Sequence, residues 1–402
     1  MKKILILTTV SGFLCKFEKE NVKILQQLGY SVHYAANALE QQYVFDESEI
    51  ENMGVQLHHI DIERSPYMIK KNRKAFIQLI KIIEENDIQI IHCHTPVGSL
   101  LGRLIGRHFS RKKRDLKIIY TVHGFHFYRN APLLNNIVYY SVEKCLARYT
   151  DKLIVINQED YQAARKLRLK ASGKIYKIPG IGLATEKFKE MLPEERQTRR
   201  SELGLSENDF FMVSVGELNE NKNQAVVLQA LAKMRSNNID ISNIKYGICG
   251  TGFFEDRLKN QIEELKLEDV VTMYGYCVDV SKILGCADIS IFPSKREGLG
   301  MAGLEALAMG VPLIAANNRG TREYMQHLKN GYVCKNNDID EYIEAIQIMQ
   351  NLKLSKMVEM KQYCQESVKP FIKEKTIKIM KKVYSELEEK PEKKVTRGNV
   401  EE

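Results

Sequence analysis

Two glutamates eight positions apart form the strongest chemical pattern in the sequence. Glu297 and Glu305 lie in Ser-Lys-Arg-Glu-Gly-Leu-Gly-Met-Ala-Gly-Leu-Glu-Ala, which follows the apolar run Ile289–Phe292 and Pro293. This order predicts a strand, a loop and a helix that starts near Leu299. Glycines let a backbone approach a ligand, and the first N–H groups of a helix favour an anion such as a diphosphate. Carboxylates accept hydrogen bonds from sugar or ribose hydroxyls. Spacing alone leaves open a plain strand-to-helix turn with an unrelated second glutamate.

Histidines at the ends of two predicted strands are the second set of candidates. His123 follows Lys117–Val122, where an imidazole can hydrogen-bond a sugar hydroxyl. His92 and His94 end another strand with both side chains on one face, as in a metal site, but the sequence shows no third ligand. No Asp-x-Asp triplet follows a predicted strand as a ligand for a metal diphosphate. We therefore expect these histidines to line a cleft, and we expect no metal site.

These candidates can meet only in a fold that brings strand ends together. In the sequence, short β-branched runs alternate with longer segments of helical periodicity. The predicted strands are Lys3–Thr9, Ser31–Ala35, Ile88–Cys93, Lys117–Val122, Lys152–Ile156, Phe210–Val215, Lys245–Cys249, Val270–Tyr274, Ile289–Phe292 and Pro312–Ala315. This alternation is typical of parallel βαβ units. It is interrupted by the Pro/Gly segment Pro179-Gly180-Ile181-Gly182 and then resumes. The fold class is therefore α/β, with two doubly wound parallel sheets that face a central cleft.

Length and composition agree with two domains inside the cell. A chain of 402 residues with 44% apolar content exceeds one compact α/β domain. No stretch approaches the ~20 apolar residues of a membrane-spanning helix, and the opening Lys2–Leu7 run is expected to be a buried strand. The eight cysteines are scattered without a Cys-x-x-Cys pair, which favours buried thiols in a reducing cytoplasm.

The net charge of +9 is concentrated in the first half of the chain. Residues 1–180 hold 28 Lys/Arg against 17 Asp/Glu, whereas the remainder carries −2. The densest cluster consists of Arg107, Arg111, Lys112, Lys113, Arg114 and Lys117. It could face anionic lipid headgroups or form a solvated loop. Nucleic acid is a weaker candidate, because no zinc-finger spacing, RNA-binding aromatic signature or basic zipper accompanies the charges.

Taken together, the motifs resemble those of the retaining glycosyltransferases of family 4, which have the GT-B fold. The resemblance is carried by the Glu297-x7-Glu305 pattern, Val215-Gly216-Glu217-Leu218-x-x-Asn221-Lys222-Asn223, Gly250-Thr251-Gly252, Gly275-Tyr276-Cys277 and Ala287-Asp288. It covers nearly the whole chain. It implies a Rossmann-like acceptor-binding domain over 1–185, a Rossmann-like donor-binding domain over 186–370, a helix over 371–388 that crosses back to the first domain, and a disordered tail over 389–402.

The same resemblance implies a set of donor-binding residues. They are Gly12, Gly216, Asn221, Lys222, Gly250, Tyr276, Cys277, Glu297, Gly298, Leu299, Gly300, Met301 and Glu305. Among them Glu305 would hold the ribose hydroxyls, the Tyr276-Cys277 turn would meet the base, and Gly12 would belong to a flexible loop near the phosphates. Lys222, Glu297 and His123 would be catalytic, with Lys222 stabilising the charge on the departing nucleotide. The family usually has an Arg where this chain has Glu217, a gap that Lys295, Arg296 or the helix dipole could fill.

For the acceptor, the resemblance points to bacterial capsule and exopolysaccharide transferases, which extend lipid-linked sugars at the inner membrane face. It places His94, Thr95 and His126 on the acceptor side. The expected protein is cytoplasmic and peripheral at an anionic membrane surface, and Phe125, Phe127 and Tyr128 could dip toward lipid. The resemblance implies a sugar donor linked to a nucleotide, with UDP as the expected one, retention of configuration, and neither cofactor nor metal.

Three other readings remain open on the sequence. A transferase acting on a soluble acceptor would share every donor motif. A catalytically silent sugar-nucleotide-binding partner subunit would bind the donor without turnover, a reading that Glu217 makes plausible. A nucleotide-sugar 2-epimerase of the same shape would need no acceptor, but the Glu297-x7-Glu305 arrangement favours transfer.

Overall fold

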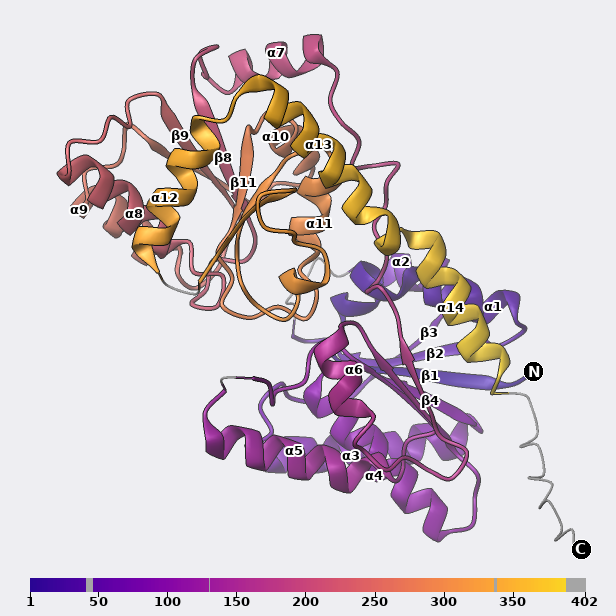
Figure 1. Ribbon diagram of the computed structural model, residues 1–402. Coiled ribbons are helices and arrows are strands. Elements are labelled where there is room, and N and C mark those ends of the chain that lie inside the picture. The colour runs from indigo at the N-terminus through magenta and orange to yellow at the C-terminus, as the bar shows by residue number, and fades with distance from the viewer. Residues whose placement is uncertain (41–45, 130, 336–337, 388–402) are drawn as a thin grey trace, which may run out of the picture. The chain divides into compact units, whose positions relative to one another are not determined.

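The computed structural model describes residues 1–40, 46–129, 131–335 and 338–387. The chain divides into two compact units (Figure 1). Unit 1 comprises Met1–Ile181 and Glu374–Glu402, and unit 2 comprises Gly182–Lys373. The chain thus leaves unit 1 four residues before the predicted boundary at 185 and returns to it at 374. The predicted tail over 389–402 lies outside the described residues.

Unit 1 is built on a seven-stranded sheet in the order β3-β2-β1-β4-β5-β6-β7, with all neighbouring strands parallel. The strands are β1 (Lys3–Val10), β2 (Ser31–Asn37), β3 (Gln56–His59), β4 (Ile90–Cys93), β5 (Lys117–Val122), β6 (Lys152–Val155) and β7 (Lys174–Lys177). The central strands are apolar on both faces because helices cover both sides of the sheet.

The helices of unit 1 include one turn of unusual geometry. They are η1 (Leu14–Glu18), α1 (Lys19–Gln27), α2 (Glu47–Asn52), α3 (Ile69–Glu85), α4 (Pro96–Arg111), α5 (Leu133–Ala147), α6 (Gln158–Ala164) and α14 (Lys373–Ser385). The segment η1 is a π-helix that leads directly into α1. The end of α14 is held by Glu386, which accepts hydrogen bonds from Lys152 and Lys174 of β6 and β7.

Unit 2 repeats the architecture with a six-stranded parallel sheet in the order β10-β9-β8-β11-β12-β13. The strands are β8 (Phe210–Val215), β9 (Ile244–Cys249), β10 (Val271–Gly275), β11 (Ile289–Phe292), β12 (Leu313–Ala316) and β13 (Gly331–Cys334). The helices are α7 (Pro193–Glu202), α8 (Ala225–Ser236), α9 (Glu255–Glu264), α10 (Ser281–Leu284), α11 (Met301–Ala308), η2 (Thr321–Glu323), α12 (Ile339–Gln350), α13 (Leu354–Val368) and η3 (Lys369–Phe371). The α/β class with two doubly wound parallel sheets is confirmed.

Each of the ten predicted strands exists, with ends within two residues of the prediction. The strands that the sequence did not predict are β3, β7 and β13, and all three lie at sheet edges. The sequences of β3 and β7, Gln-Leu-His-His and Lys-Ile-Tyr-Lys, are polar and half exposed, so they lack the apolar run of a central strand. The third, β13, is a buried strand of four residues that follows a turn-rich segment.

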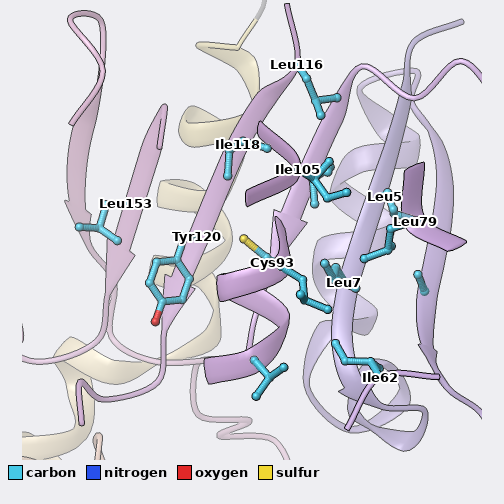
Figure 2. Packing of buried hydrophobic residues seen from close by; sticks show 14 of the residues in the cluster. Leu5, Leu7, Ile62, Leu79, Cys93, Ile105, Leu116, Ile118, Tyr120 and Leu153 are labelled. Atoms are coloured by element: carbon cyan, nitrogen blue, oxygen red, sulfur yellow. The ribbon is translucent and has the colours of Figure 1, made fainter. Parts of the chain in front are cut away.

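Helix α4 approaches the sheet of unit 1 closely because glycines form a stripe on its inner face. Figure 2 shows the core beneath it, where Leu7, Cys93 and Ile118 pack together. A Cβ atom added at Gly106 would lie 2.7 Å from Cγ1 of Ile118, and one at Gly102 would lie 3.1 Å from Sγ of Cys93. The glycines therefore set the distance between α4 and the sheet, and with it the position of the loop between β4 and α4.

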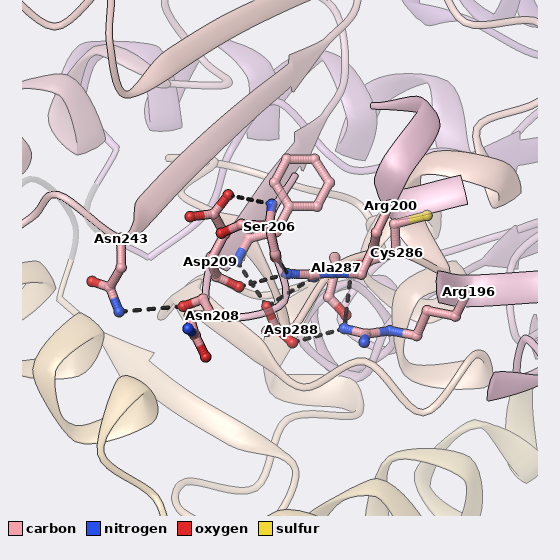
Figure 3. Close-up of polar contacts among 10 residues, drawn as sticks. Arg196, Arg200, Ser206, Asn208, Asp209, Asn243, Cys286, Ala287 and Asp288 are labelled. Atoms are coloured by element: carbon pink, nitrogen blue, oxygen red, sulfur yellow. Dashed lines mark hydrogen bonds and ion pairs between the residues drawn. The ribbon is translucent and has the colours of Figure 1, made fainter. Parts of the chain in front are cut away.

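In unit 2, Asp288 joins helix α7 to the sheet. Its carboxylate accepts hydrogen bonds from Arg196 Nη2 at 2.7 Å, from Arg200 Nη1 at 3.2 Å and from the backbone N–H of Phe211 at 2.8 Å (Figure 3). The charged stretch at 194–200 thus lies in a helix of unit 2, and two of its arginines are held by a half-buried carboxylate at the start of β11.

All eight cysteines lie in the described part of the chain and are free thiols, as expected from their spacing. Six of them are buried. Among the described residues, no helix combines the length and apolar character needed to cross a membrane.

Replacing Gly106 by alanine tests the close packing of α4. The new methyl group would overlap Ile118, so we expect a loss of about 1–3 kcal/mol in the free energy of unfolding, measured by urea denaturation. Ser110→Ala, on the exposed face of the same helix, is the control and should change stability by less than about 0.5 kcal/mol. Equal stability of the two variants would contradict the packing argument.

Candidate functional site

Both sheets have a switch point at which the strand order reverses, and the predicted residues gather there. In unit 1 the switch lies between β1 and β4, and in unit 2 between β8 and β11. Ligands of open α/β sheets bind beyond the carboxyl ends of strands at such points, because the neighbouring connections leave in opposite directions. Gly12 and His94 follow β1 and β4, and Gly216 and Glu297 follow β8 and β11.

An ion pair between two predicted catalytic residues is the centre of the unit 2 site. Lys222 Nζ lies 2.6 Å from Glu297 Oε1, and the side chains are 22% and 13% exposed. The ammonium also lies 5.4 Å from the ring centroid of Phe292 at the end of β11. A charge-assisted hydrogen bond with this little solvent around it holds both groups firmly. The two residues are 75 positions apart in the sequence. Neither the motif that contains Lys222 nor the motif that contains Glu297 predicted this ion pair.

The loop between β11 and α11 is fixed by its neighbours. The side-chain amide of Asn221 donates to the Arg296 carbonyl at 2.9 Å, and the Lys295 N–H donates to the Asn221 carbonyl at 2.8 Å. Gly300 adopts φ 86°, a left-handed conformation that favours glycine, and ends the loop as the N-cap of α11. The helix consequently begins at Met301, so the prediction of a start near Leu299 was wrong by two residues.

The remaining predicted donor residues lie at the same edge in different environments. A Cβ at Gly250 would lie 1.9 Å from the Gly216 carbonyl oxygen, so the loops after β8 and β9 touch through their glycines. Tyr276 is 63% exposed after β10. Leu299 is buried, which leaves its backbone and not its side chain available to a ligand. Among the others, Cys277, Gly298, Met301 and Glu305 are half-buried.

Several groups supply positive charge near Glu217, the position where the resemblance implies an arginine. Glu217 is exposed after β8. Lys295 lies 3.3 Å from Glu220 in an exposed ion pair, and Arg296 is half-buried in the β11–α11 loop. Positive charge at this edge thus comes from Lys222, Lys295 and Arg296, together with the N-terminus of α11.

Sequence reasoning missed the turn after β12, which supports the Glu297 loop. The Asn318 side chain donates to the Ser294 carbonyl at 2.8 Å and accepts from the N–H groups of Gly320 and Thr321. The buried Arg319 donates through Nε to the Glu297 carbonyl at 3.3 Å. The signal was present, because Asn317-Asn318-Arg319-Gly320 is a polar turn directly after a predicted strand.

In unit 1, three residues from different elements meet at the carboxyl ends of β4 and β5. His94 Nδ1 lies 3.1 Å from His123 Nε2 and 3.5 Å from Glu18 Oε1. Phe13 packs on both imidazoles, with ring centroids 5.5 Å from His94 and 5.4 Å from His123. His94 and Glu18 are buried and His123 is exposed. The sequence predicted both histidines but not Glu18, whose charged surroundings Lys-Phe-Glu-Lys-Glu suggest a solvated helix face.

Desolvation shifts the pKa values of this cluster toward the uncharged forms. Desolvation raises the pKa of Glu18 to about 8, against a smaller opposing effect of the Asn21 hydrogen bond. Desolvation also holds the pKa of His94 well below its usual range. His123 is exposed, yet the part of its ring that packs on Phe13 and His94 is shielded from water, and this desolvation lowers its pKa to about 4. Neutral imidazoles can both donate and accept hydrogen bonds.

Gly12 does not lie in an open loop after β1. Gly12 is buried in a helical turn that leads through the π-helix η1 into α1, because Phe13 packs on the histidines and fixes the chain. Thr95 adopts φ 58°, an unusual conformation for a β-branched residue, at the N-cap of α4. Such strain is concentrated at functional sites. His126 stacks on Tyr139 of α5, with ring centroids 5.1 Å apart.

The expectation about metal ligands needs correction in one respect. His92 hydrogen-bonds Tyr384 and Thr121 through its two ring nitrogens, so it is a core residue that fastens α14 to the sheet. The third ligand that the sequence did not show for His94 is present, since Glu18, His94 and His123 bring ligating atoms within 4.8 Å of one another.

An Asp-x-Asp triplet also follows a strand that was not predicted, at Asp338 and Asp340 after β13. Its roles are structural, because Asp338 caps α12 and Asp340 pairs with Lys233.

Comparison with known families agrees with this fold. Residues 195–369 match the model of the glycosyl transferases group 1, and residues 3–157 match the glycosyl transferase 4-like model. The chain belongs to this family of GT-B glycosyltransferases. The two matches correspond to the two sheet-bearing units.

Two relatives and two solved structures illustrate the likeness. The putative glycosyltransferase EpsD of Bacillus subtilis is 38% identical over 86% of this chain and 87% of its own. The UDP-Gal:alpha-D-GlcNAc-diphosphoundecaprenol alpha-1,3-galactosyltransferase of Escherichia coli is 30% identical over 69% and 70%. HepE of Anabaena in complex with UDP and glucose superposes with a TM-score of 0.72 over 96% and 99% of the chains, at 17% identity. The sucrose-phosphate synthase of Thermosynechococcus elongatus gives 0.76 over 96% and 99%, at 17% identity.

Removing the Asn318 side chain tests whether the turn after β12 holds the site loop. Asn318→Ala leaves three buried backbone groups without partners, so we expect a loss of about 2–4 kcal/mol in the free energy of unfolding. Hydrogen exchange of residues 294–300 should accelerate more than that of the β8 strand. Asn317→Ala, at an exposed neighbouring position, should leave both quantities unchanged. Unaltered exchange in the Asn318 variant would show that other contacts hold the loop.

Proposed function

We propose that this glycosyltransferase moves a sugar from a nucleotide-sugar donor, UDP-linked, to a lipid-linked saccharide in exopolysaccharide or capsule biosynthesis. Transfer retains the configuration at the anomeric carbon and uses no metal ion or other cofactor. The observation that carries the proposal is the Lys222–Glu297 ion pair at the switch point of a chain that belongs to this family.

The donor half of the proposal is supported by the charges in unit 2. Lys222 is positioned to neutralise the diphosphate as it departs, and the N-terminus of α11 adds a positive dipole end. Glu297 orients the ammonium before the donor arrives, so little reorganisation is needed. Glu305, half-buried on the first turns of α11, offers a carboxylate to the ribose hydroxyls. Tyr276, exposed after β10, offers a ring to the base.

Retention without a metal ion is supported by what these groups can do themselves. The leaving diphosphate gains negative charge on the face where Lys222 and the helix start lie, and fixed positive groups there lower the barrier to its departure. In unit 1, His123 offers an imidazole to a sugar hydroxyl and is contacted by the buried His94, while Thr95 and His126 line the acceptor side. No general-base step is assigned to any of them.

Lipid-linked acceptors are supported by an apolar helix face in unit 1. On α5, Asn136, Tyr140 and Glu143 face inward, where Glu143 forms an ion pair with the buried Arg103. The opposite face exposes a row of large apolar side chains: Leu133, Leu134, Ile137, Val138 and Val142. An exposed apolar row beside basic residues is typical of a helix that rests in a membrane interface.

The aromatic loop that the sequence suggested for this role is not exposed. Phe125 is buried and stacks on Phe127, which packs in turn on Tyr140 of α5. The aromatic residues instead support α5 from beneath. The basic cluster at 107–117 is partly neutralised, since Lys112, Arg114 and Lys117 pair with Glu84, Asp87 and Asp151. We therefore assign membrane contact to α5.

The relatives support the proposed pathway and donor. The name of the Escherichia coli relative specifies a UDP-sugar donor and a diphosphoundecaprenol-linked acceptor. EpsD is described as a putative glycosyltransferase. The present chain shares with both the sequence pattern of the two units, which supports the same class of donor and acceptor here.

Two variants separate donor binding from turnover. Glu305→Ala should weaken binding of the preferred nucleotide sugar by about tenfold, because a ribose contact is lost. Lys222→Ala should lower turnover by about 10²–10³-fold with a smaller change in binding, because the lysine acts mainly on the leaving group. Calorimetric titration and nucleotide release measure the two quantities. Wild-type affinity and turnover in both variants would refute the site assignment.

A pair of charges on α5 tests the membrane face. Ile137→Asp with Val138→Asp should lower binding to vesicles of phosphatidylglycerol and phosphatidylethanolamine by about tenfold or more, because two inserted apolar side chains are lost. Ile77→Asp, at an equally exposed apolar position on α3, is the matched control and should bind as wild type does. If sedimentation shows the same vesicle binding for all three proteins, α5 is not the contact surface.

A further inference from the structure

We infer that Tyr324 is a positioning residue for the donor diphosphate. Its phenol O–H holds the peptide between Gly300 and Met301, so that the Met301 N–H stays directed at the edge of unit 2 where the donor is proposed to bind. The inference deepens the proposed function and rests on it, because the diphosphate meets this peptide only if the donor binds there. Neither the sequence motifs nor the comparisons indicate a role for Tyr324.

Two glycines at the start of α11 form a notch for this phenol. A Cβ atom added at Gly303 would lie 2.4 Å from Tyr324 Oη, and one added at Gly300 would lie 3.1 Å from the same oxygen. The shorter distance leaves no room for a methyl group, so a larger residue at 303 would displace the hydroxyl. The notch thus gives a reason for Gly303, which lies inside the helix, where alanine is the better helix former.

The hydroxyl in this notch fixes the direction of one peptide. Tyr324 Oη donates to the Gly300 carbonyl at 3.2 Å, and the Gly303 N–H donates to the same carbonyl at 3.1 Å. Because the C=O and N–H of a trans peptide point in opposite directions, holding the Gly300 carbonyl along the helix directs the Met301 N–H away from it. Met301 is the first residue of α11, so this N–H has no partner within the helix and is available to an anion.

Gly300 depends on such a contact because its own backbone does not fix the peptide. Its φ and ψ are 86° and 69°, in the left-handed region. Glycine has no Cβ atom, so several conformations of similar energy are open to it, and a neighbouring group must hold one of them. The phenol O–H is the side-chain group that does so here.

The phenol is itself held firmly by its surroundings. The backbone N–H of Tyr324 donates to the Thr321 carbonyl at 3.2 Å, and Asn330 Nδ2 donates to the Tyr324 carbonyl at 2.8 Å. The ring packs edge-on against Phe371 of η3, with centroids 6.1 Å apart, and the residue is 3% exposed. Burial, and then the nearby Glu297 carboxylate, raise the pKa of Tyr324 well above its usual range, so the phenol keeps the hydrogen that it donates.

Removal of the phenol oxygen alone tests the inference. Tyr324→Phe keeps the ring packing and should lower kcat by about 10- to 100-fold with donor KM changed by less than about threefold, because the misplaced N–H acts mainly on the departing diphosphate. Tyr246→Phe is the matched control, since it removes another buried hydroxyl of unit 2, which donates to Ser214 Oγ at 2.7 Å within the sheet. Both variants should lower the melting temperature similarly, but the control should keep wild-type kcat. Equal kcat in the two variants would overturn the inference.

Gly303→Ala displaces the same hydroxyl by another route. The new methyl group would push the phenol oxygen out of the notch, so this variant should lower kcat as Tyr324→Phe does. Where the hydroxyl is already absent, the methyl group has less to displace, so adding Gly303→Ala to Tyr324→Phe should lower kcat by less than about threefold more. Effects that multiply in the double variant would show that the two residues act independently, which contradicts the inference.

A spectroscopic readout makes the test independent of turnover. In protein labelled with ¹⁵N-methionine, the Met301 amide signal, identified by its loss in Met301→Leu, should move downfield when UDP is added to wild type or to Tyr246→Phe. In Tyr324→Phe at saturating UDP, the same signal should move by less than half as much.

The outcomes separate the inference from the proposed function. An equal Met301 shift in Tyr324→Phe, or no shift when wild type binds UDP, would overturn the inference while leaving the proposed transfer intact. If wild type shows the shift and Tyr324→Phe loses it, but no acceptor stimulates sugar transfer, the proposed function fails and the positioning role of Tyr324 stands.

Discussion

Parallel strand pairing is the constraint on which the rest of this molecule depends. Every neighbouring pair in both sheets runs in the same direction, so all strand ends of one kind collect at one edge. Residues that are far apart in the sequence therefore meet without any long-range motif: Lys222 follows β8 and Glu297 follows β11, two strands that are neighbours in the sheet. The reversal of strand order opens a gap between connections at that edge, and the polar residues of each unit lie there.

Unit 1 and unit 2 each have a polar cluster at their strand ends, and the two clusters hold their groups in different ways. In unit 2 the groups are charged and paired, and backbone contacts from Asn221, Asn318 and Arg319 fix the loop that carries Glu297. In unit 1 desolvation raises the pKa of Glu18 and lowers the pKa values of His94 and His123, so the cluster favours uncharged groups. An electrostatic role toward a diphosphate suits the first arrangement. Recognition of uncharged sugar hydroxyls suits the second.

The sequence predicted the parts of the fold that have a strong local signal. The central strands are apolar on both faces, so their runs of Val, Ile and Leu were found with nearly correct ends, and the polar residues after them were the right ones to examine. The edge strands β3 and β7 were missed because their alternating polar residues lack that signal. The start of α11 was misplaced because the left-handed conformation of Gly300 depends on the surrounding loop.

Residues that act through packing were harder to predict. The sequence did not predict that Glu18 is buried, because a carboxylate in a lysine-rich helix is usually solvated. In the structure Glu18 lies at the end of a π-helical turn and its side chain is buried. The packing of the loop that the sequence favoured as a lipid contact was also hard to predict. Phe125 of this loop is buried, whereas Phe127 and Tyr128 are half-buried, because the loop packs against α5, whose own apolar residues are exposed.

The most direct test of the central claim is acceptor-dependent nucleotide release. The purified chain would be incubated with a panel of UDP- and GDP-sugars, with and without membrane extract that contains lipid-linked saccharides, and with Glu305→Ala as the blank. The account predicts that release from one UDP-sugar rises strongly when the lipid-linked acceptor is present and falls to the blank in the variant. Binding of a UDP-sugar without release under any acceptor condition would contradict transfer and would indicate a catalytically silent subunit.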